Sequence, residues 1–422
     1  MAKIKAIRSR EILDSRGTPT LETMVWSDDG HGAISSVPSG ASTGKSEALE
    51  LRDEDPNRFH GKGVLKAVSN VNSVISSYII NHDPTKQNEI DQILINLDNT
   101  PNKSKLGANA MLSVSMAVCE LGAAVSGLQT YEYIAQKYQI HAPYSKRLPT
   151  PVFNLINGGK HGAGNLDFQE FHLIPSTQIP FSTALQMGDT VYMNLKKILS
   201  DKNAIFSVGD EGGFAPNLYG NLDALELIVQ AVGETTYKIN QDLYLGMDVA
   251  ASSFFKGGKY TIRDRQEGYR PEEFIKFITD TKKQYGLLSL EDPLDEEAWE
   301  HWSSLVAEIG QETMIVGDDL LTTNKKRLQK AIDTRAANSI IIKPNQVGTI
   351  SETLQTIKLA KKAGFSIIVS HRSGDTDEDF MADFAVGVGA DYVKFGAPAR
   401  MERVSKYNRL LFIQDYLASQ GR

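Results

Sequence analysis

The stretch NSIIIKPNQVG, residues 338–348, gives the clearest indication of the fold. Three isoleucines follow one another with no polar residue between them, which is typical of a strand covered on both faces, as in a parallel sheet. Lys343 follows directly and would lie at the mouth of a core. Such an ammonium group either reaches solvent at the strand end or stays desolvated with a lowered pKa, as a general base does. Its neighbours decide between these two interpretations.

The second half of the chain repeats this pattern. Eight short apolar stretches end in polar residues: PVFNLINGG, FQEFHLIP, YLGMDVAAS, LLSLEDPL, MIVGDDL, SIIIKPNQVG, SIIVSHRSG and YVKFGAPA. Most are followed by a helical pattern, and the steps from Glu291 to Asp318, Lys343, His371 and Lys394 are 27, 25, 28 and 23 residues, about one βα unit each. We therefore expect an α/β fold with a (β/α)₈ barrel of the TIM type. Its start should be irregular, because the first two strands lie too close together for a helix between them. An open, doubly wound sheet is the structural alternative.

The first part of the chain has a different pattern. Up to about residue 60, strand-like stretches alternate with turn signals such as DSRGTP and DDGHG, which predicts a β-meander. From residue 64 to residue 135 the apolar spacing is helical, ending in the long stretch ANAMLSVSMAVCELGAAVSGLQTYEYIA. A polar, proline-containing segment follows. We therefore expect an α+β capping domain over residues 1–136 and the barrel over residues 137–422.

Composition excludes several classes of partner. The chain of 422 residues is 41% hydrophobic and 23% charged, with a formal net charge of −7, which argues against nucleic acid or an anionic membrane as primary partner. Its single cysteine, Cys119, cannot form an internal disulfide. We found no signal-peptide pattern at the N-terminus and no run of about 18 uninterrupted apolar residues. A soluble, cytoplasmic protein is expected.

Charged residues gather at the predicted strand ends, where a barrel of this kind carries its chemistry. One alone could be a salt bridge closing the barrel mouth, but so many together indicate an active site. The residues at these ends are Glu170, Asp248, Glu291, Asp318, Lys343, His371, Arg372, Ser373 and Lys394.

Three of these carboxylates, Asp248, Glu291 and Asp318, come from successive strands and need a cation between them. An all-oxygen set suits Mg²⁺, whereas zinc would need His or Cys pairs. Lys394, Arg372 and His371 are suited to hold the carboxylate and phosphate of an anionic substrate. Lys343, among these cations and an apolar strand, would lose its proton near neutral pH. A neutral amine beside a metal-bound carboxylate can remove the proton α to that carboxylate.

The stretch VPSGASTGKSEALELRD, residues 37–53, is similar to a nucleotide-binding P-loop, but three residues separate its two glycines where that motif has four. It is either a surface loop of small residues or a loop whose Ser42 reaches a second metal when substrate is bound.

With these residues noted, the chain resembles the enolase family over nearly its whole length. The matching stretches include AIRSREILDSRGTPTLE, VPSGASTGKSEALELRD, NGGKHGAGNLDFQEF, GDEGGFAPN, LEDPLDE, VGDDLLTTN, IIKPNQVGTISET, SHRSG and GAPARMERVSKYN. A Lys or His base with one or two Mg²⁺ is the established pattern of that superfamily. The resemblance implies a lyase of glycolysis and gluconeogenesis that interconverts 2-phosphoglycerate and phosphoenolpyruvate plus water, usually as a homodimer.

The resemblance also implies a role for each matching residue. Lys343 would take the C2 proton and Glu211 would assist departure of the C3 hydroxyl. Asp248, Glu291 and Asp318 would hold the first Mg²⁺, and Ser42 would complete a second Mg²⁺ site. Arg372 and Ser373 would bind the phosphate and Lys394 the carboxylate. The remaining residues implied to line the pocket are His161, Gln169, Glu170 and His371.

The chain departs from the family pattern at a few positions. Phe395 stands after Lys394 where the family commonly has threonine or serine, Phe171 and His172 follow Glu170 where a methionine is usual, and Thr18 replaces an asparagine. A large ring beside a substrate-binding lysine favours a second hypothesis, a paralogue that abstracts the α-proton of a related phosphorylated acid. A third hypothesis is a non-catalytic binding or scaffold protein, which predicts loss of the charged strand-end residues.

Overall fold

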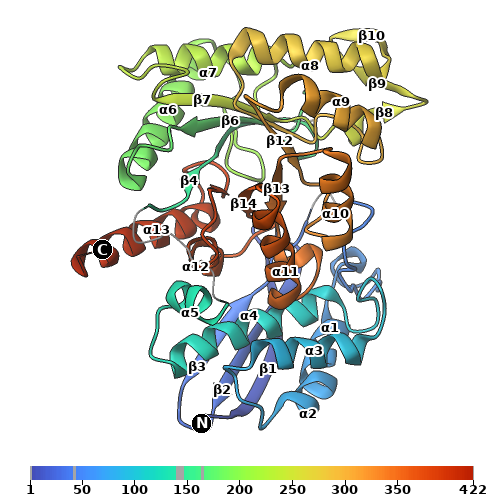
Figure 1. Ribbon diagram of the computed structural model, residues 1–422, viewed down its shortest axis with the longest axis vertical. Coiled ribbons are helices and arrows are strands. Elements are labelled where there is room, and N and C mark those ends of the chain that lie inside the picture. The colour runs from blue at the N-terminus through green and yellow to red at the C-terminus, as the bar shows by residue number, and fades with distance from the viewer. Residues whose placement is uncertain (1, 41–43, 139–146, 163–165, 422) are drawn as a thin grey trace.

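A computed structural model describes residues 2–40, 44–138, 147–162 and 166–421. The N-terminal sheet and its helices form one end of the molecule, and the barrel with its surrounding helices forms the other (Figure 1). The predicted boundary between residues 136 and 137 falls at the end of α5 (Thr130–Lys137), before the barrel begins with β4 (Thr150–Pro151). The division into two domains at that residue stays a prediction.

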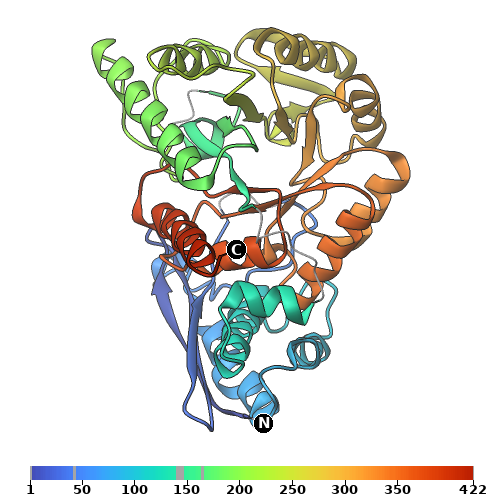
Figure 2. The ribbon, with the colours of Figure 1, turned by 60° about the vertical axis from the view of Figure 1, so that its left-hand side comes forward.

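The N-terminal part contains the predicted meander. Strands β1 (Ile4–Leu13), β2 (Pro19–Ser27) and β3 (Gly32–Ser36) form an antiparallel sheet in that order. The helical segments that follow lie on one side of this sheet (Figure 2), and α4 packs across β2 and β3. These segments are α1 (Leu65–Ser69), a π-type segment (Asn70–Ile75), α2 (Ser76–Ile79), α3 (Gln87–Asp98), α4 (Ala108–Val125) and α5.

The long helical stretch expected from residue 108 to residue 135 is divided in two. Helix α4 ends at Val125 and α5 begins at Thr130. Gly127, in the turn between them, has φ +67, a backbone conformation that side-chain-bearing residues rarely adopt. Apolar periodicity continued through this turn, so the sequence pattern did not show the break.

Helix α4 is also long and apolar enough to cross a membrane by length and composition alone. However, 83% of it is buried inside the protein. Its apolar side chains pack into the core between the sheet and the neighbouring helices, which accounts for its composition.

The second part of the chain is built around one sheet, whose strand order is β4-β15-β14-β13-β12-β11-β7-β6-β5. All eight predicted strand segments are present. Their bounds are β4 with β5 (Phe153–Asn157), β6 (Glu170–Pro175), β7 (Leu243–Asp248), β11 (Ser289–Glu291), β12 (Met314–Gly317), β13 (Ser339–Ile342), β14 (Ser366–Ser370) and β15 (Tyr392–Lys394).

The sheet closes on itself. Only Val152 separates β4 from β5, and these two pieces pair with opposite ends of the strand order, β15 and β6. The N–H of Val152 donates to the carbonyl of Val393 at 2.8 Å and so continues the pairing across the interruption. The structure is therefore a barrel, and the open doubly wound sheet is wrong. The expected irregular start is confirmed, since β6 runs antiparallel to both of its neighbours while the other pairs are parallel.

The barrel interior and the helix-facing layer are two separate apolar clusters. The inner cluster contains Val152, Ile174, Val316, Ile341, Ile368 and Tyr392. Ile340 and Ile342 belong instead to the larger core that packs against the helices. The unbroken isoleucine run is thus buried on both faces, with alternate side chains inside and outside the barrel.

The barrel helices lie around this sheet, as expected from the helical patterns between the strands (Figure 1). They are α6 (Phe181–Asp201), α7 (Asp223–Gly233), α8 (Pro271–Tyr285), α9 (Trp299–Ile309), α10 (Lys325–Thr334), α11 (Ile350–Lys362), α12 (Phe380–Gly387) and α13 (Met401–Ser419). A small antiparallel sheet of β8 (Phe255–Lys256), β9 (Lys259–Ile262) and β10 (Arg265–Tyr269) lies between β7 and α8 and was not anticipated.

Candidate active site

The alternation of side-chain direction along the strands places three predicted site residues at the barrel mouth. Asp318, Lys343 and Lys394 each follow, by two residues, a side chain of the inner apolar cluster: Val316, Ile341 and Tyr392. Residues two apart on a strand point to the same face. The same periodicity that buries the isoleucines therefore places these charges above the inner core.

Glu170 reaches the same mouth by a different route from the one predicted. We expected Glu170 at the carboxyl end of a strand, but it is the first residue of β6. Because β6 runs antiparallel to β7, its beginning lies beside the end of β7, and Glu170 pairs with Asp248 in the register. Reversal of this one strand thus leaves the residue at the predicted edge of the barrel.

Lys394 lies at the centre of a group of buried carboxylates. Its Nζ is 2.8 and 2.9 Å from the two carboxylate oxygens of Glu291, 3.3 Å from Oε2 of Glu170 and 3.6 Å from Oδ2 of Asp248. Gln169 Nε2 donates to Oδ2 of Asp248 at 3.0 Å. One ammonium group therefore faces three carboxylates, which leaves an excess of negative charge in a site removed from water.

This excess is visible in the proton affinities of the acids. Burial raises the pKa of Asp248 to about 7, in part offset by Lys394. Burial and the neighbouring charge of Asp248 raise the pKa of Glu291 to about 8. Raised pKa values of this size mean that the positive charge near these carboxylates does not compensate for their burial. A hard divalent cation with oxygen ligands fits this donor set.

Lys343 forms an ion pair with Asp318. Oδ1 of the same carboxylate accepts a hydrogen bond from Gln346 Nε2 at 2.9 Å. Burial alone would lower the pKa of Lys343, but the charge of Asp318 outweighs it, so the pKa is raised. The expectation that this lysine loses its proton near neutral pH is wrong for the ion-paired state. The expectation fails because Lys343 contacts Asp318, and the sequence alone does not show that contact.

Glu211 lies in a second buried group. Its Oε1 is 3.3 Å from His161 Nδ1, and its Oε2 is 3.5 Å from His371 Nε2 and accepts from Asn154 Nδ2 at 3.0 Å. Burial would raise the pKa of Glu211, but the two imidazoles hold it well below its usual range. Glu211, with Glu170, raises the pKa of His161 to about 10 against the effect of burial. A protonated His161 and an ionised Glu211 thus form a buried ion pair.

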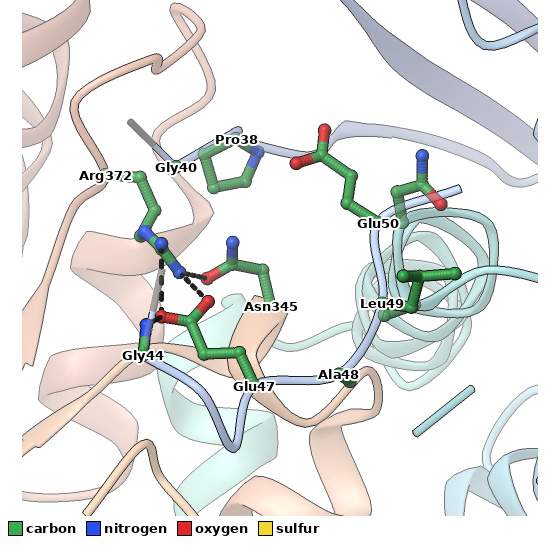
Figure 3. A pocket seen from close by; sticks show the side chains of 11 residues that line it. Pro38, Gly40, Gly44, Glu47, Ala48, Leu49, Glu50, Asn345 and Arg372 are labelled. Atoms are coloured by element: carbon green, nitrogen blue, oxygen red, sulfur yellow. Dashed lines mark hydrogen bonds and ion pairs between the residues drawn. The ribbon is translucent and has the colours of Figure 1, made fainter. Parts of the chain in front are cut away.

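Arg372 is buried where the N-terminal part meets the barrel. Its guanidinium Nη1 donates to Glu47 Oε2 at 2.9 Å and to Asn345 Oδ1 at 3.1 Å (Figure 3). These residues line a cavity of about 260 Å³ between residues 38–40 and 44–50, the start of α4 and the barrel. The neighbouring Ser373 is also buried.

Most of the predicted site residues thus converge at one end of the barrel. Ser42 lies outside the described residues. Among the described residues, the clusters of His and acidic side chains whose ligand atoms lie within 4.8 Å of one another are His161 with Glu170 and Glu211, and Asp318 with Asp292 and Asp319. The predicted set of Asp248, Glu291 and Asp318 shares only Asp318 with them. Lys394 lies against Asp248 and Glu291. In Asp292 the carboxylate already accepts backbone hydrogen bonds from Asp318 and Asp319.

Sequence reasoning missed several residues that hold these groups in place. Glu47, Gln346 and Arg403 lie in stretches quoted above, but none is at a strand end. Arg403 on α13 is fully buried, and its Nη1 lies 2.7 Å from His371 Nδ1. Hydrophobic periodicity does not show that a charged residue of a helix, such as Arg403, is buried. For Gln346 the sequence gave one indication, the two amide residues that follow Lys343.

Phe395 turns away from the site. Its side chain is fully buried and its ring centroid lies 6.0 Å from that of Tyr407 on α13. Like Val393, it belongs to the helix-facing core, whereas Tyr392 belongs to the inner cluster. The ring therefore packs behind β15 and does not narrow the pocket, which removes the observation that favoured a different substrate.

Comparison with known families agrees with this geometry. Residues 4–134 match the family model described as the enolase N-terminal domain. Residues 145–422 match the model described as the enolase C-terminal TIM barrel domain. Together the two matches span most of the chain, in the order in which the two parts of the structure occur. The chain therefore belongs to the enolase family.

Proposed function

We propose that this enolase-family lyase interconverts 2-phosphoglycerate and phosphoenolpyruvate plus water. The observation that carries the proposal is the placement of one lysine, Lys343, against Asp318, beside a second lysine within a buried group of carboxylates. A base, a cation site and an anion site at one barrel mouth are what proton removal next to a carboxylate requires.

In this proposal Lys343 removes the proton from C2. The C2–H electron pair passes into the C1–C2 bond and gives a carboxylate with two negative charges. Lys394 binds the carboxylate and stabilises the second charge as it forms. Mg²⁺, held by Asp248, Glu291 and Asp318, would supply further positive charge at that carboxylate.

Binding of a cation to Asp318 also bears on the protonation of Lys343. Burial, Arg372 and Lys394 lower the pKa of Lys343, but Asp318 and, to a smaller extent, Glu291 raise it and prevail. A cation held by Asp318 would supply positive charge there and would reduce the effect of Asp318 on Lys343. Burial, Arg372 and Lys394 favour the neutral amine, which is the form that acts as the base.

Loss of the C3 hydroxyl completes the reaction. The electron pair at C2 forms the C2–C3 double bond, and the C3–O bond breaks. The departing oxygen takes up a proton and leaves as water. In this proposal the proton comes from the buried His161–Glu211 ion pair, in which His161 has a raised pKa. Glu211 thus assists departure of the hydroxyl, with His371 on its other oxygen.

Arg372 and Ser373 bind the phosphate in this proposal, while Gln169 and Glu170 line the pocket. Two Mg²⁺ per site, Ser42 as a ligand of the second, a homodimer, and a cytoplasmic role in glycolysis and gluconeogenesis also belong to the proposal. These parts rest on the family resemblance.

The experiment that tests this function follows absorbance of the enol product while the purified chain is mixed with 2-phosphoglycerate. Formation of phosphoenolpyruvate that requires Mg²⁺ supports the proposal. An inert chain that still binds Mg²⁺ and inorganic phosphate would refute the substrate assignment while leaving the family membership intact.

A further inference from the structure

We propose that Glu47, in the N-terminal part of the chain, is a positioning residue for Arg372. This inference rests on the proposed function, in which Arg372 binds the substrate phosphate. Glu47 would act by holding the guanidinium in one orientation, and would not itself contact the substrate.

The carboxylate of Glu47 is surrounded by donors. Oε2 accepts from Arg372 Nη1 at 2.9 Å, and Oε1 accepts from Arg372 Nη2 at 3.4 Å (Figure 3). Oε1 also accepts from the backbone N–H of Gly44 at 3.1 Å and from Gln346 Nε2 at 3.3 Å. A two-pronged contact of this kind fixes the plane of a guanidinium as well as its position.

The backbone that carries Glu47 is itself tied to the barrel. The N–H of Ala48 donates to the carbonyl of Gln346 at 2.8 Å, and the N–H of Glu47 donates to the carbonyl of Gly44 at 3.1 Å. Both Glu47 and Arg372 have less than a tenth of their side chains exposed. The backbone hydrogen bonds therefore fix the position from which the Glu47 side chain extends, and water competes little for the contacts of its carboxylate.

Gln346 connects this pair to the base and its partner. Its Oε1 accepts from Thr323 Oγ1 at 2.7 Å, which fixes its Nε2 as the donor on the other side. That Nε2 donates both to Glu47 and to Asp318 Oδ1, and Asp318 is the ion-pair partner of Lys343. Thr323 Oγ1 in turn accepts from the backbone N–H of Lys343 at 2.9 Å. One amide thus links the arginine's partner to the groups proposed to bind metal and remove the proton.

Substitution of Glu47 by glutamine distinguishes a positioning role of Glu47 from a purely electrostatic effect of its charge on phosphate binding. Glu47→Gln removes a negative charge near the phosphate site, so Coulomb's law alone predicts tighter binding of an anion. It also replaces one acceptor oxygen by an NH₂ group in surroundings made up of donors, so the two-pronged contact with Arg372 is lost. Positioning therefore predicts weaker binding. Glu47→Asp keeps the charge but withdraws the carboxylate by about one bond length, roughly 1.5 Å, and should weaken binding as well.

The test measures the dissociation constant of inorganic phosphate by calorimetry, on the full chain with Mg²⁺ present. We expect both Glu47 variants to bind about tenfold more weakly than the wild type, the scale of one charge-assisted hydrogen bond. With 2-phosphoglycerate, KM should rise by a similar factor while kcat changes less. A thermal melt of each variant shows whether it is folded.

Glu50→Gln is the matched control. Glu50 lines the same cavity (Figure 3), and its charge acts on Arg372. Its carboxylate, however, forms an ion pair with Arg52. Glu50→Gln should leave phosphate affinity unchanged or slightly raised. If Glu47→Gln binds phosphate as tightly as the wild type or more tightly, Glu47 is a structural residue or a competitor for Arg372, and the inference is wrong.

Arg372→Ala separates the two levels of the proposal. If the wild type binds phosphate and Arg372→Ala binds it equally well, the phosphate role of Arg372 fails, and the inference fails with it. If Arg372→Ala loses binding while both Glu47 variants keep it, the inference alone fails and the proposed function stands.

Discussion

Lys394 Nζ lies 2.8 Å from Oε2 of Glu291, and the same ammonium group also faces Glu170 and Asp248. Its single charge must therefore serve three buried carboxylates. Burial raises the pKa values of Asp248 and Glu291, and the one ammonium group offsets this only in part. Stability should therefore depend on pH and on Mg²⁺.

Without a divalent cation, stability should fall as the pH rises. Asp248 and Glu291 have folded-state pKa values of about 7 and about 8, above the values that free carboxyl groups have. From about pH 4 upward the folded chain therefore binds more protons than the unfolded chain, and the free energy of unfolding falls by about 1.4 kcal/mol per pH unit for each group until its folded pKa is passed.

Urea titrations between pH 5 and pH 9 measure this slope. Addition of Mg²⁺ should flatten it, because the cation supplies the missing charge and displaces the protons. Asp248→Asn should also flatten it, since the amide does not titrate. A slope unchanged by Mg²⁺ would mean that no divalent cation binds these carboxylates.

A separate loss of stability at higher pH is expected from the titration of His161. Its pKa of about 10 is raised by Glu211 and Glu170 against the effect of burial. The stabilisation by this ion pair is complete below the unfolded value of about 6.5 and is lost as the pH rises through 10, at up to about 1.4 kcal/mol per pH unit. His161→Gln should remove this alkaline slope in a denaturant titration. An identical slope in the variant would show that the proton is not held by His161.

Arg403 should be required for the arrangement of the site. Its Nη1 lies 2.7 Å from His371 Nδ1 and donates to the carbonyl of Arg372 at 2.6 Å, and its Nη2 donates to the carbonyls of Asp210 and Ser373 at 2.8 and 2.7 Å. Because the guanidinium can only donate, His371 Nδ1 must accept, so its Nε2 carries the hydrogen that faces Glu211. Arg403→Met should lower the free energy of unfolding by about 3–5 kcal/mol, as loss of one partner of a buried charged network does.

Activity and stability of this variant can be separated with a second variant on the same helix. Arg409 pairs with Asp383 at 2.6 Å, away from the barrel mouth. Arg409→Met should lose stability with kcat unchanged, whereas Arg403→Met should lose both, even at temperatures where it is fully folded. Equal kcat in the two variants would contradict a role of Arg403 in orienting His371.

Much of the fold was predictable from periodicity, because a strand buried on both faces has an unbroken run of apolar residues in the sequence. The run Ile340–Ile342 predicted a parallel strand correctly, and the recurrence of such runs predicted the barrel. The same reasoning failed for Glu170, since a strand pattern carries no information on direction. It also failed for the break at Gly127, where apolar spacing continued through a turn.

Periodicity predicted candidate site residues only where charge followed an apolar strand, whereas His161, Gln169 and Glu211 were expected from the family resemblance. Lys343, Asp318 and Lys394 have that signal. Glu47 and Arg403 lack it, because they come from a loop of the N-terminal part and from the last helix, and their relation to the barrel mouth exists only in three dimensions. The pairing of Lys343 with Asp318 was likewise invisible, although it reverses the expected direction of the lysine's pKa.

Phe395 should be a residue of the core and not of the pocket. Phe395→Thr removes a fully buried ring that packs against Tyr407 and should lower the free energy of unfolding by about 3 kcal/mol. Its KM for 2-phosphoglycerate should equal that of the wild type at a temperature where both are folded. A changed KM with unchanged stability would place the ring at the substrate.

The most direct test of the account is the rate of phosphoenolpyruvate formation from 2-phosphoglycerate by the wild type and by Lys343→Ala, each with Mg²⁺ and with a chelator. We predict formation that depends on Mg²⁺ in the wild type and a loss of at least about 10³-fold in the variant, as removal of a general base implies. Activity in Lys343→Ala within tenfold of the wild type, in a variant that melts at the same temperature, would contradict the assignment of Lys343 as the base.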